Sequence, residues 1–246
     1  ANYSIQFVIP SGYSLSPKDS GSDNTKDSDA SANGTTDSTT LAQGENDLSW
    51  DMGIYVTPAS LGDYVWFDDN NNGIQDSGEN PANGIRVILY GAQCGVGSPV
   101  AETTTGTNGK YSFENLAPGT YTVKFIRPTG SSFTLTNVVS ADDSKDSDAD
   151  ADGCSAPITL APGDSDLTTD AGIVVLSSIG NFVWLDMDRN GFQDADEIGV
   201  PGVHVILLDK NGDAIAGKEL VTDDNGGYLF DGLLPGTYSV QFDLST

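Results

Sequence analysis

The sequence has little of the residues on which several kinds of chemistry depend. Its 246 residues include one His, two Cys, and 10 Lys and Arg against 36 Asp and Glu. A single His argues against a His-based catalytic triad and against a His-rich metal site. The formal net charge of −26 argues against nucleic acid as a partner, because phosphate binding requires clustered Lys and Arg. No apolar run approaches the ~20 residues of a membrane span, so we expect no membrane insertion, and no signal peptide is visible at the start.

The acidic residues are concentrated in four short stretches. Six aspartates lie between Asp142 and Asp152, and similar stretches cover Asp19–Asp29, Asp68–Glu79 and Asp186–Glu197. Like charges at this density repel one another, and a folded domain must offset the repulsion. The stretches are therefore either solvated loops or sites for divalent cations, and the spacing within each one distinguishes the two.

The chain is an internal repeat that is cut out of phase. GDYVWFDDNNNGIQDSGE at Gly62–Glu79 returns 118 residues later as GNFVWLDMDRNGFQDADE at Gly180–Glu197. KDSDASANG at Lys26–Gly34 returns as KDSDADADG at Lys145–Gly153. This order predicts three segments. They are the C-terminal half of a unit at 1–57, a complete unit at 61–177, and the N-terminal half of a unit at 179–246.

This phasing leads to an expectation about partners. Neither half is expected to bury a core alone, since each lacks its partner strands. We favour the interpretation that the chain is a segment of a longer protein, in which neighbouring repeats are the partners. The alternative is that the tail of one copy completes the head of another, a heterologous contact that would build a filament.

The spacing of apolar residues predicts an all-β fold. Short runs rich in Val, Ile, Tyr and Phe, such as Ile85–Tyr90 and Thr120–Ile126, are separated by Gly, Pro, Asn and Asp. Tyr121, Val123 and Phe125 alternate with polar residues, as in a half-buried strand. No segment has a sustained helical period. We expect tandem Ig-like antiparallel β-sandwich repeats of about 118 residues, with roughly seven strands in each.

Two dodecapeptides fit the calcium-loop pattern D-x-[DN]-x-[DN]-G-x5-E. Oxygen ligands at positions 1, 3 and 5 converge when the chain coils tightly, Gly at position 6 permits the turn, and Glu at position 12 closes the shell. Hard oxygen ligands without His or Cys favour Ca²⁺ over zinc or copper. The flanking segments read as strands, so each loop would sit on a β scaffold. The predicted metal ligands are Asp68, Asn70, Asn72, Ile74, Asp76 and Glu79 in the first loop, and Asp186, Asp188, Asn190, Phe192, Asp194 and Glu197 in the second.

The aspartate-rich segment predicts a second, less specific metal site. Four of its aspartates recur at every second position: Asp146, Asp148, Asp150 and Asp152. In an extended chain they would project to one face, where four carboxylates are costly without a cation. A solvated loop is the alternative. The first half-unit repeats part of the pattern, and a lone acid opens a later strand in each copy, so the candidate ligands are Asp146, Asp148 and Asp170 in the complete unit and Asp27, Asp29 and Asp51 in the first half-unit.

Taken together, these motifs resemble the SdrD-type B domains of serine–aspartate-repeat surface adhesins, a branch of the Cna-B-like sandwiches. The matching elements are G-[DN]-x-V-W-x-D-x-[DN]-x-N-G-x-Q-D-x-x-E, N-G-x-Y-x-F-x-x-L-x-P-G-x-Y, K-D-S-D-x-x-x-x-G and D-x-G, in the family's order. The resemblance implies an extracellular, Ca²⁺-stiffened stalk of tandem Ig-like units that holds a ligand-binding tip away from the cell. The family's loop ligands carry over onto Asp68, Asn70, Asn72, Asp76 and Glu79, and onto their equivalents in the second loop.

The two cysteines depart from that resemblance. Cys94 and Cys154 both fall in the complete unit, whereas the first half-unit has Thr35 in place of Cys154 and the last half-unit has no Cys. Cysteines that are present and absent together suggest a disulfide, which suits an oxidising exterior. Two free thiols are the alternative.

The sequence thus favours a structural function over the other classes. The main hypothesis is a Ca²⁺-dependent structural repeat of a long extracellular adhesin, stalk or fibre. The alternative is a carbohydrate- or protein-binding module, which would need an exposed aromatic platform that the sequence does not clearly provide. We expect no enzyme, because scattered Ser and Asp with one His on a strand offer no nucleophile–base pair.

Overall fold

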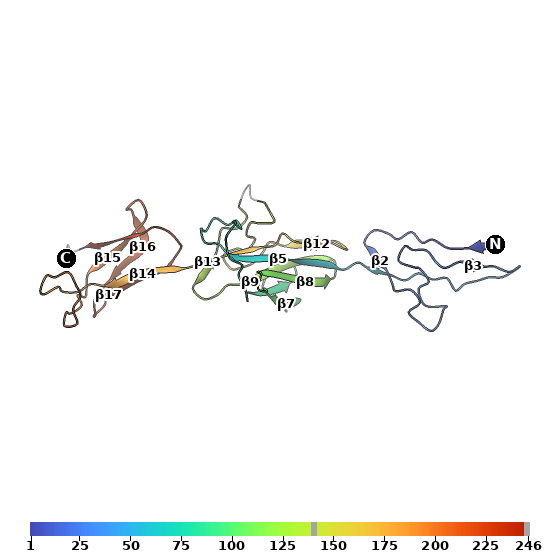
Figure 1. The fold of residues 1–246 in the computed structure, drawn as a ribbon, viewed down its shortest axis with the longest axis horizontal. Helices are drawn as coiled ribbons and strands as arrows, with labels where there is room; N and C mark the ends of the chain where they lie inside the picture. The colour runs from blue at the N-terminus through green and yellow to red at the C-terminus, as the bar shows by residue number, and fades with distance from the viewer. Residues whose placement is uncertain (139–141, 244–246) are drawn as a thin grey trace.

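The computed structural model describes residues 1–138 and 142–243. All the named secondary-structure elements in these ranges are β-strands. Figure 1 shows three bodies in a row along one axis, with the two chain ends at opposite extremes. We call them the N-terminal segment (1–57), the central unit (59–175) and the C-terminal segment (177–243). Strand β4 ends at Val56 and β5 begins at Ala59, while a single residue separates β13 from β14, so both connectors are short. Among the described residues there is no helix with the length and apolar character to cross a membrane.

The central unit is a β-sandwich of two sheets. One sheet has the order β10-β13-β5-β12, with β8 also paired to β5, and the other has the order β11-β9-β6-β7. The strands are β5 (Ala59–Phe67), β6 (Arg86–Tyr90), β7 (Ala101–Thr104), β8 (Lys110–Leu116), β9 (Gly119–Ile126), β10 (Ser131–Phe133), β11 (Ile158–Leu160), β12 (Ser165–Asp166) and β13 (Ala171–Val175). The predicted all-β sandwich is confirmed. The sequence did not predict that β5 pairs in parallel with both β12 and β13, which makes the first sheet mixed.

The core of the central unit is formed by the facing sides of both sheets. Val65 of β5, Val87 of β6 and Val123 of β9 are fully buried, and Tyr111 packs edge-on against Phe125. Burial of each large apolar side chain stabilises the fold by about 1.5–3 kcal/mol. Cys94 and Cys154 form a disulfide with 6.1 Å between their Cα atoms, and Cys154 pairs with Lys124 of β9. The bond joins the acidic segment to the sandwich.

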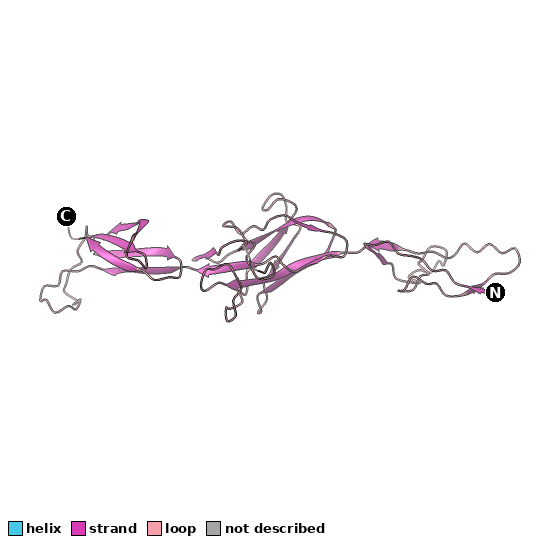
Figure 2. Ribbon diagram, turned by 90° about the horizontal axis from the view of Figure 1, so that it is seen from above, coloured by secondary structure: helices cyan, strands magenta, loops and turns pink. Residues whose placement is uncertain are grey.

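The flanking segments reproduce parts of this pairing scheme. The N-terminal segment contains β1 (Asn2–Tyr3), β2 (Tyr13–Leu15), β3 (Thr39–Thr40) and β4 (Ile54–Val56), and the C-terminal segment contains β14 (Ser177–Phe182), β15 (His204–Leu208), β16 (Ala214–Val221), β17 (Gly227–Leu233) and β18 (Ser239–Asp243). The β2–β4 pair matches β10–β13, and β15–β18 matches β6–β9. Figure 2 shows that loops make up most of the N-terminal segment, whereas strands dominate the C-terminal one.

The two segments differ in how much core they bury. Of the apolar side chains in the N-terminal segment, Ala30 alone is buried. The C-terminal segment buries a cluster of four apolar side chains, Val205, Leu207, Phe230 and Leu233. The expectation that neither half buries a core is therefore wrong for the C-terminal segment. Its strands β14–β18 form two small sheets that already face each other, because they include the equivalents of β5, β6, β8 and β9.

Candidate metal centre

The first predicted loop begins where β5 ends and is organised around Asp68. This side chain is 1% exposed. Its Oδ2 accepts hydrogen bonds from the Gly73 amide at 2.8 Å and from the Thr134 hydroxyl at 2.5 Å, and its Oδ1 accepts the amides of Asn70 and Asn72. A carboxylate that accepts backbone amides two to five residues ahead fixes a tight turn. The loop therefore has a defined shape that its own first residue imposes.

Glu79 closes the same loop from its other end. Its Oε1 accepts the Asp69 amide at 3.0 Å and its Oε2 accepts the Asp76 amide at 2.9 Å. The side-chain amides of Asn70 and Asn72 both donate to Asp76 Oδ2 at 2.8 Å. Burial raises the pKa of the Glu79 carboxyl, and the neighbouring loop carboxylates raise it further. Acidic groups are thus gathered at a point where their negative charges oppose one another.

Gly73 at position 6 ties this loop to the rest of the central unit. Its φ is +80°, and a Cβ there would lie 2.5 Å from the carbonyl oxygen of Leu135. Gly73 O accepts the Ser147 amide, and Ile74 forms a β-bridge with Asp146. The loop and the aspartate-rich segment, far apart in the sequence, therefore lie side by side.

The second loop repeats the hydrogen bonds by which the first and last carboxylates close the first loop. Asp186 Oδ2 accepts the Gly191 amide at 3.0 Å, and its Oδ1 accepts the Asn190 amide at 3.2 Å. Glu197 accepts the amides of Met187 and Asp194, as Glu79 does in the first loop. Two copies of the motif thus adopt the same local geometry in different surroundings.

Three carboxylates of the second loop converge. Ligand oxygens of Asp186, Asp188 and Glu197 all lie within 4.8 Å of one another, and in the described part of the chain this is the one such group of three or more His, Cys, Asp or Glu. The first loop has Asn70 where the second has Asp188, so its set contains an amide oxygen instead. Both donor sets consist of oxygen alone and suit a hard divalent cation. Asp188, Phe192 and Asp194 are exposed at the surface.

In the aspartate-rich segment the structure pairs Asp148 with Asp170. Asp148 Oδ2 accepts the Asp170 amide at 2.7 Å, while Asp170 Oδ1 accepts the Tyr64 amide of β5 at 2.8 Å. Burial, with nearby carboxylates such as Asp63 adding to it, raises the pKa of Asp170 to about 9, and burial raises the pKa of Asp148 to about 7. Asp170 Oδ2 is buried and accepts no hydrogen bond. A cation or a proton would satisfy it.

The third candidate ligand of this segment, Asp146, does not join the pair formed by Asp148 and Asp170. Its side chain is 5% exposed, its Oδ1 accepts no hydrogen bond, and burial raises its pKa. It does not form a three-carboxylate group with Asp148 and Asp170 of the closeness found in the second loop.

The expectation that four alternating aspartates project to one face is wrong. Asp150 and Asp152 are exposed, and Asp150 Oδ1 accepts the amides of Asp152 and Cys154. The chain turns there, with Gly153 at a φ of +83°, and does not stay extended. Strict alternation of side chains therefore ends after Asp148.

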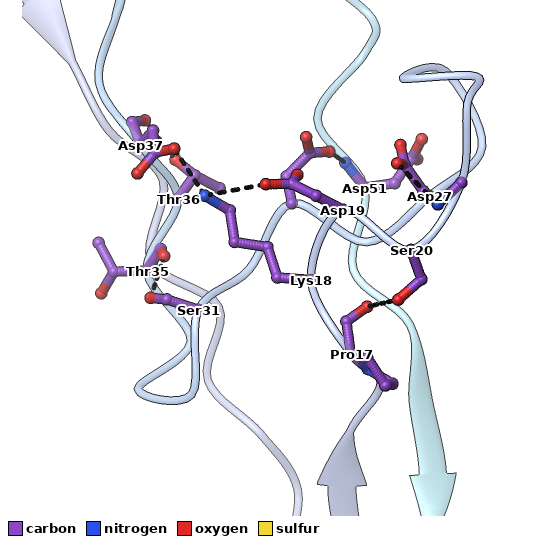
Figure 3. A network of polar contacts seen from close by, with 12 residues as sticks. Pro17, Lys18, Asp19, Ser20, Asp27, Ser31, Thr35, Thr36, Asp37 and Asp51 are labelled. Carbon is purple, nitrogen blue, oxygen red and sulfur yellow. Dashed lines mark hydrogen bonds and ion pairs between the residues drawn. The ribbon is translucent and has the colours of Figure 1, made fainter.

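The N-terminal segment carries the corresponding arrangement. Asp29 Oδ2 accepts the Asp51 amide at 2.7 Å, and Asp27 Oδ1 is buried without a hydrogen bond, like its equivalent Asp146. Lys18 Nζ in the same segment lies 2.6 Å from Asp37 Oδ2 and 3.5 Å from Asp19 Oδ2 (Figure 3). Unlike the buried Asp170, Asp51 is exposed. The strand that would supply the equivalent of the Tyr64 amide is not part of this segment.

Sequence reasoning missed Thr134, which bonds to the first ligand of the first loop. Thr134 lies 66 residues from Asp68 and donates to it from the segment that follows β10. Its hydroxyl also lies 3.1 Å from Asn71 Oδ1. A Thr in a strand-like run carries no signal of such a role, so only the fold reveals it.

Comparison with known proteins gives a consistent answer. The family model for the SdrD B-like domain matches residues 1–54, 59–173 and 177–246. Serine-aspartate repeat-containing protein F of Staphylococcus epidermidis is 38% identical over 98% of this chain, and protein D of Staphylococcus aureus strain Newman is 39% identical over 98%. The chain spans 13% and 17% of the lengths of these two relatives.

Among solved structures, the Bacillus anthracis TIE protein aligns over 100% of this chain and 37% of its own, at 14% identity and a TM-score of 0.42. GBS52, the minor pilin of Streptococcus agalactiae, aligns over 74% of this chain and 82% of its own, at 15% identity and a TM-score of 0.33. The evidence for the family comes from the sequence matches. The chain therefore belongs to the SdrD B-like family, whose members are extracellular structural domains of cell-surface proteins.

Proposed function

We propose that this chain is a calcium-stiffened structural repeat of a long extracellular adhesin, stalk or fibre. The observation that carries the proposal is the pair of acidic loops at Asp68–Glu79 and Asp186–Glu197, which share one hydrogen-bond pattern in two repeats. A pattern of ligands kept twice in one chain is what a repeated cation site requires. A merely solvated turn would have no need of the same oxygens in the same places.

Each ion would be held by oxygen ligands alone. The first loop would supply the side chains of Asp68, Asn70, Asn72, Asp76 and Glu79 with the Ile74 carbonyl, and the second those of Asp186, Asp188, Asn190, Asp194 and Glu197 with the Phe192 carbonyl. Asp146, Asp148 and Asp170, and likewise Asp27, Asp29 and Asp51, would serve further ions. Buried oxygens without a hydrogen-bond partner on Asp27, Asp146 and Asp170 support this assignment.

Stiffening follows from the charge. A net charge of −26 opposes compaction, and each Ca²⁺ removes two charges where they are densest. Free Ca²⁺ at ~100 times the dissociation constant adds about 2.7 kcal/mol of stability, and extracellular modules often bind at ~10⁻⁴–10⁻³ M. The sites would be filled outside the cell and largely empty where Ca²⁺ is scarce.

The partners in this role are neighbouring repeats of the same protein. The chain covers less than a fifth of the two relatives' lengths, so the parts that bind a target would lie elsewhere in a protein of that kind. The role is structural and not catalytic. The one His, His204, lies exposed on β15 with Val221 and Asp243 as its strand neighbours, which supports a place in the sheet and not in a catalytic site.

Removal of calcium tests the proposal. The melting temperature and the protease resistance of the 246-residue chain are measured in EDTA, after addition of excess Ca²⁺, and after addition of Mg²⁺ at the same concentration. We expect EDTA to lower both quantities and Ca²⁺, but not Mg²⁺, to restore them. Small-angle scattering should show a more variable shape in EDTA. Identical melting and scattering in chelator and in Ca²⁺ would refute the proposal.

A further inference from the structure

The connector between the N-terminal segment and the central unit is held from both sides. Thr57 and Pro58 alone separate β4 from β5. The Thr57 amide donates to Gly12 O of the N-terminal segment at 3.0 Å, and Thr57 O accepts the Gly163 amide of the central unit at 3.1 Å. The Thr57 hydroxyl also lies 2.8 Å from Ser14 Oγ. One residue therefore bonds to both bodies that it joins.

The two bodies touch directly beside this residue. The turn Pro10–Tyr13, here called the tail turn, faces Ala161–Asp164, here called the head turn. Gly12 has a φ of +84°, and a Cβ on it would lie 3.0 Å from Pro162 Cβ. That separation is closer than carbon atoms normally approach, so the contact requires glycine on one side and a compact turn on the other.

The head turn is a rigid part of the central unit. The Asp164 amide donates to Ala161 O at 3.1 Å, and Asp164 Oδ2 accepts the Ala161 amide at 2.8 Å, so the turn is closed by its own residues. The Ser60 amide donates to Asp164 O, which fixes the turn to the start of β5. None of these groups belongs to the predicted calcium ligands.

Both partners of this contact recur along the chain. Gly130, the equivalent of Gly12, has a φ of +79°, and its carbonyl accepts the Leu176 amide as Gly12 accepts that of Thr57. A Cβ on Gly130 would meet no atom within 4 Å. The Ala42–Glu45 turn repeats the head turn, with Gln43 in place of Pro162 and Glu45 Oε2 accepting the Ala42 amide. The same surfaces thus lie at equivalent places in successive units.

We propose that the tail turn of one unit and the head turn of the next form a joint that fixes the angle between repeats without calcium. The partner that such a tail turn accepts is a Pro-Gly or Gln-Gly turn closed by its own Asp or Glu. Two backbone bonds and one close packing contact suffice, because the two-residue connector already brings the surfaces together and little orientational freedom remains to be lost. The joint sets direction, whereas the metal sites stiffen each unit.

The test measures the spread of distances between spin labels on the two bodies. Labels are placed on Ser38→Cys and Glu114→Cys, both exposed, in the full chain with its native disulfide closed. In EDTA the parent chain should give one narrow distribution. Gly12→Ala and Pro162→Ala should roughly double its width, since the freed connector allows a wide range of orientations.

Matched controls separate the joint from local strain. Gly130→Ala carries the same left-handed backbone strain but meets no neighbour. Gln43→Ala alters the equivalent turn, where a Cβ on the adjacent Gly44 would meet no atom within 4 Å. Both should leave the distribution unchanged. Equal broadening by Gly12→Ala and Gly130→Ala, or no broadening by Pro162→Ala, would overturn the joint. A parent distribution that is narrow in excess Ca²⁺ and broad in EDTA would show that the joint needs calcium, which also contradicts the proposal while leaving the calcium role intact.

Discussion

The two copies of the acidic loop have the same local geometry and different surroundings. In both, the first carboxylate accepts the amide at position 6 and the last one accepts the amides at positions 2 and 9. Asp68 is 1% exposed and Gly73 packs on Leu135, whereas Asp186 is half-buried and Gly191 has open space around it. Phe192, the equivalent of the half-buried Ile74, is 75% exposed.

This comparison separates two contributions to a metal loop. The shape of the loop follows from short-range hydrogen bonds that twelve consecutive residues supply, so it forms in both copies. Its burial depends on the aspartate-rich segment and on Thr134, which reach the first loop from later in the chain. The metal ligands of the first loop should therefore be better preorganised than those of the second loop.

Removing the disulfide should have the largest effect. The bond occurs in the central unit alone among the three bodies and closes a loop with a sequence separation of 60. Replacing both Cys94 and Cys154 by Ser should lower the free energy of unfolding by about 2–4 kcal/mol. Chemical denaturation followed by hydrogen exchange should locate the loss in residues 59–175. An equal loss of protection in the C-terminal segment would contradict a stabilising effect confined to the central unit.

Truncating the first carboxylate should distinguish the loops next. Asp68→Ala leaves the buried amide of Gly73 without its acceptor and leaves the hydroxyl of Thr134 with Asn71 Oδ1 alone, and it should cost about 2–3 kcal/mol in EDTA. Asp186→Ala, the matched variant, should cost at most about 1 kcal/mol because water can replace its partners. Denaturation curves of both variants give the comparison. Equal losses would mean that burial does not distinguish the two loops.

The supporting hydroxyl should affect metal affinity at one loop alone. Thr134→Val removes the bond to Asp68 with little change in volume and should weaken Ca²⁺ binding at the first loop by about tenfold. Binding at the second loop should not change. Calorimetric Ca²⁺ titrations measure the affinity of the variant. Repeating them with Glu197→Gln added, which suppresses binding at the second loop, resolves the two sites. Unchanged affinity at the first loop would show that Thr134 does not orient Asp68.

A change of opposite sign is expected at the paired aspartates in the absence of calcium. The folded pKa of Asp170, about 9, exceeds the ordinary Asp value of 3.8, so the folded state binds the proton more tightly than the unfolded state. The stability that this proton contributes is complete below about pH 4 and is lost as the pH rises towards 9. Asp170→Asn keeps an acceptor for the Tyr64 amide and removes the charge, so it should raise the melting temperature in EDTA at pH 8.

Calcium and a control variant sharpen that prediction. The gain should disappear in excess Ca²⁺, because the metal stabilises the ionised carboxylate and Asn does not replace it. Asp152→Asn removes the same charge from an exposed position in the same segment and should have little effect in either condition. A gain of equal size from Asp152→Asn would mean that general repulsion, and not burial at Asp170, is responsible.

Particular residues show how far the sequence could be interpreted. The alternation of Tyr121, Val123 and Phe125 predicted a strand with one buried face, and all three are buried. The spacing of Asp186 and Asp188, with Glu197 at the loop's end, predicted a convergence that the structure contains. Periodicity and loop spacing are local properties, so a single copy of the sequence suffices to predict them.

Prediction from residue spacing failed where contacts with distant segments determine which side chains are buried. Four alternating aspartates looked equivalent, yet Asp146 and Asp148 lie against the sandwich, whereas Asp150 turns the chain outward. Nothing in their spacing distinguishes them, because the difference arises from the contacts with Ile74 and Asp170. The parallel pairing of β5 with β13 was missed for the same reason.

The repeat, the all-strand fold and the shape of each acidic loop follow from the amino-acid sequence, since they depend on residues that are close along the chain. Packing between distant segments accounts for which copy of the loop is buried, which aspartates carry unpaired oxygens, and how Thr57 joins two units. Burial and desolvation depend on what lies opposite a side chain. In this protein those opposing groups lie 22 to 106 residues away, as the partners of Asp170 do.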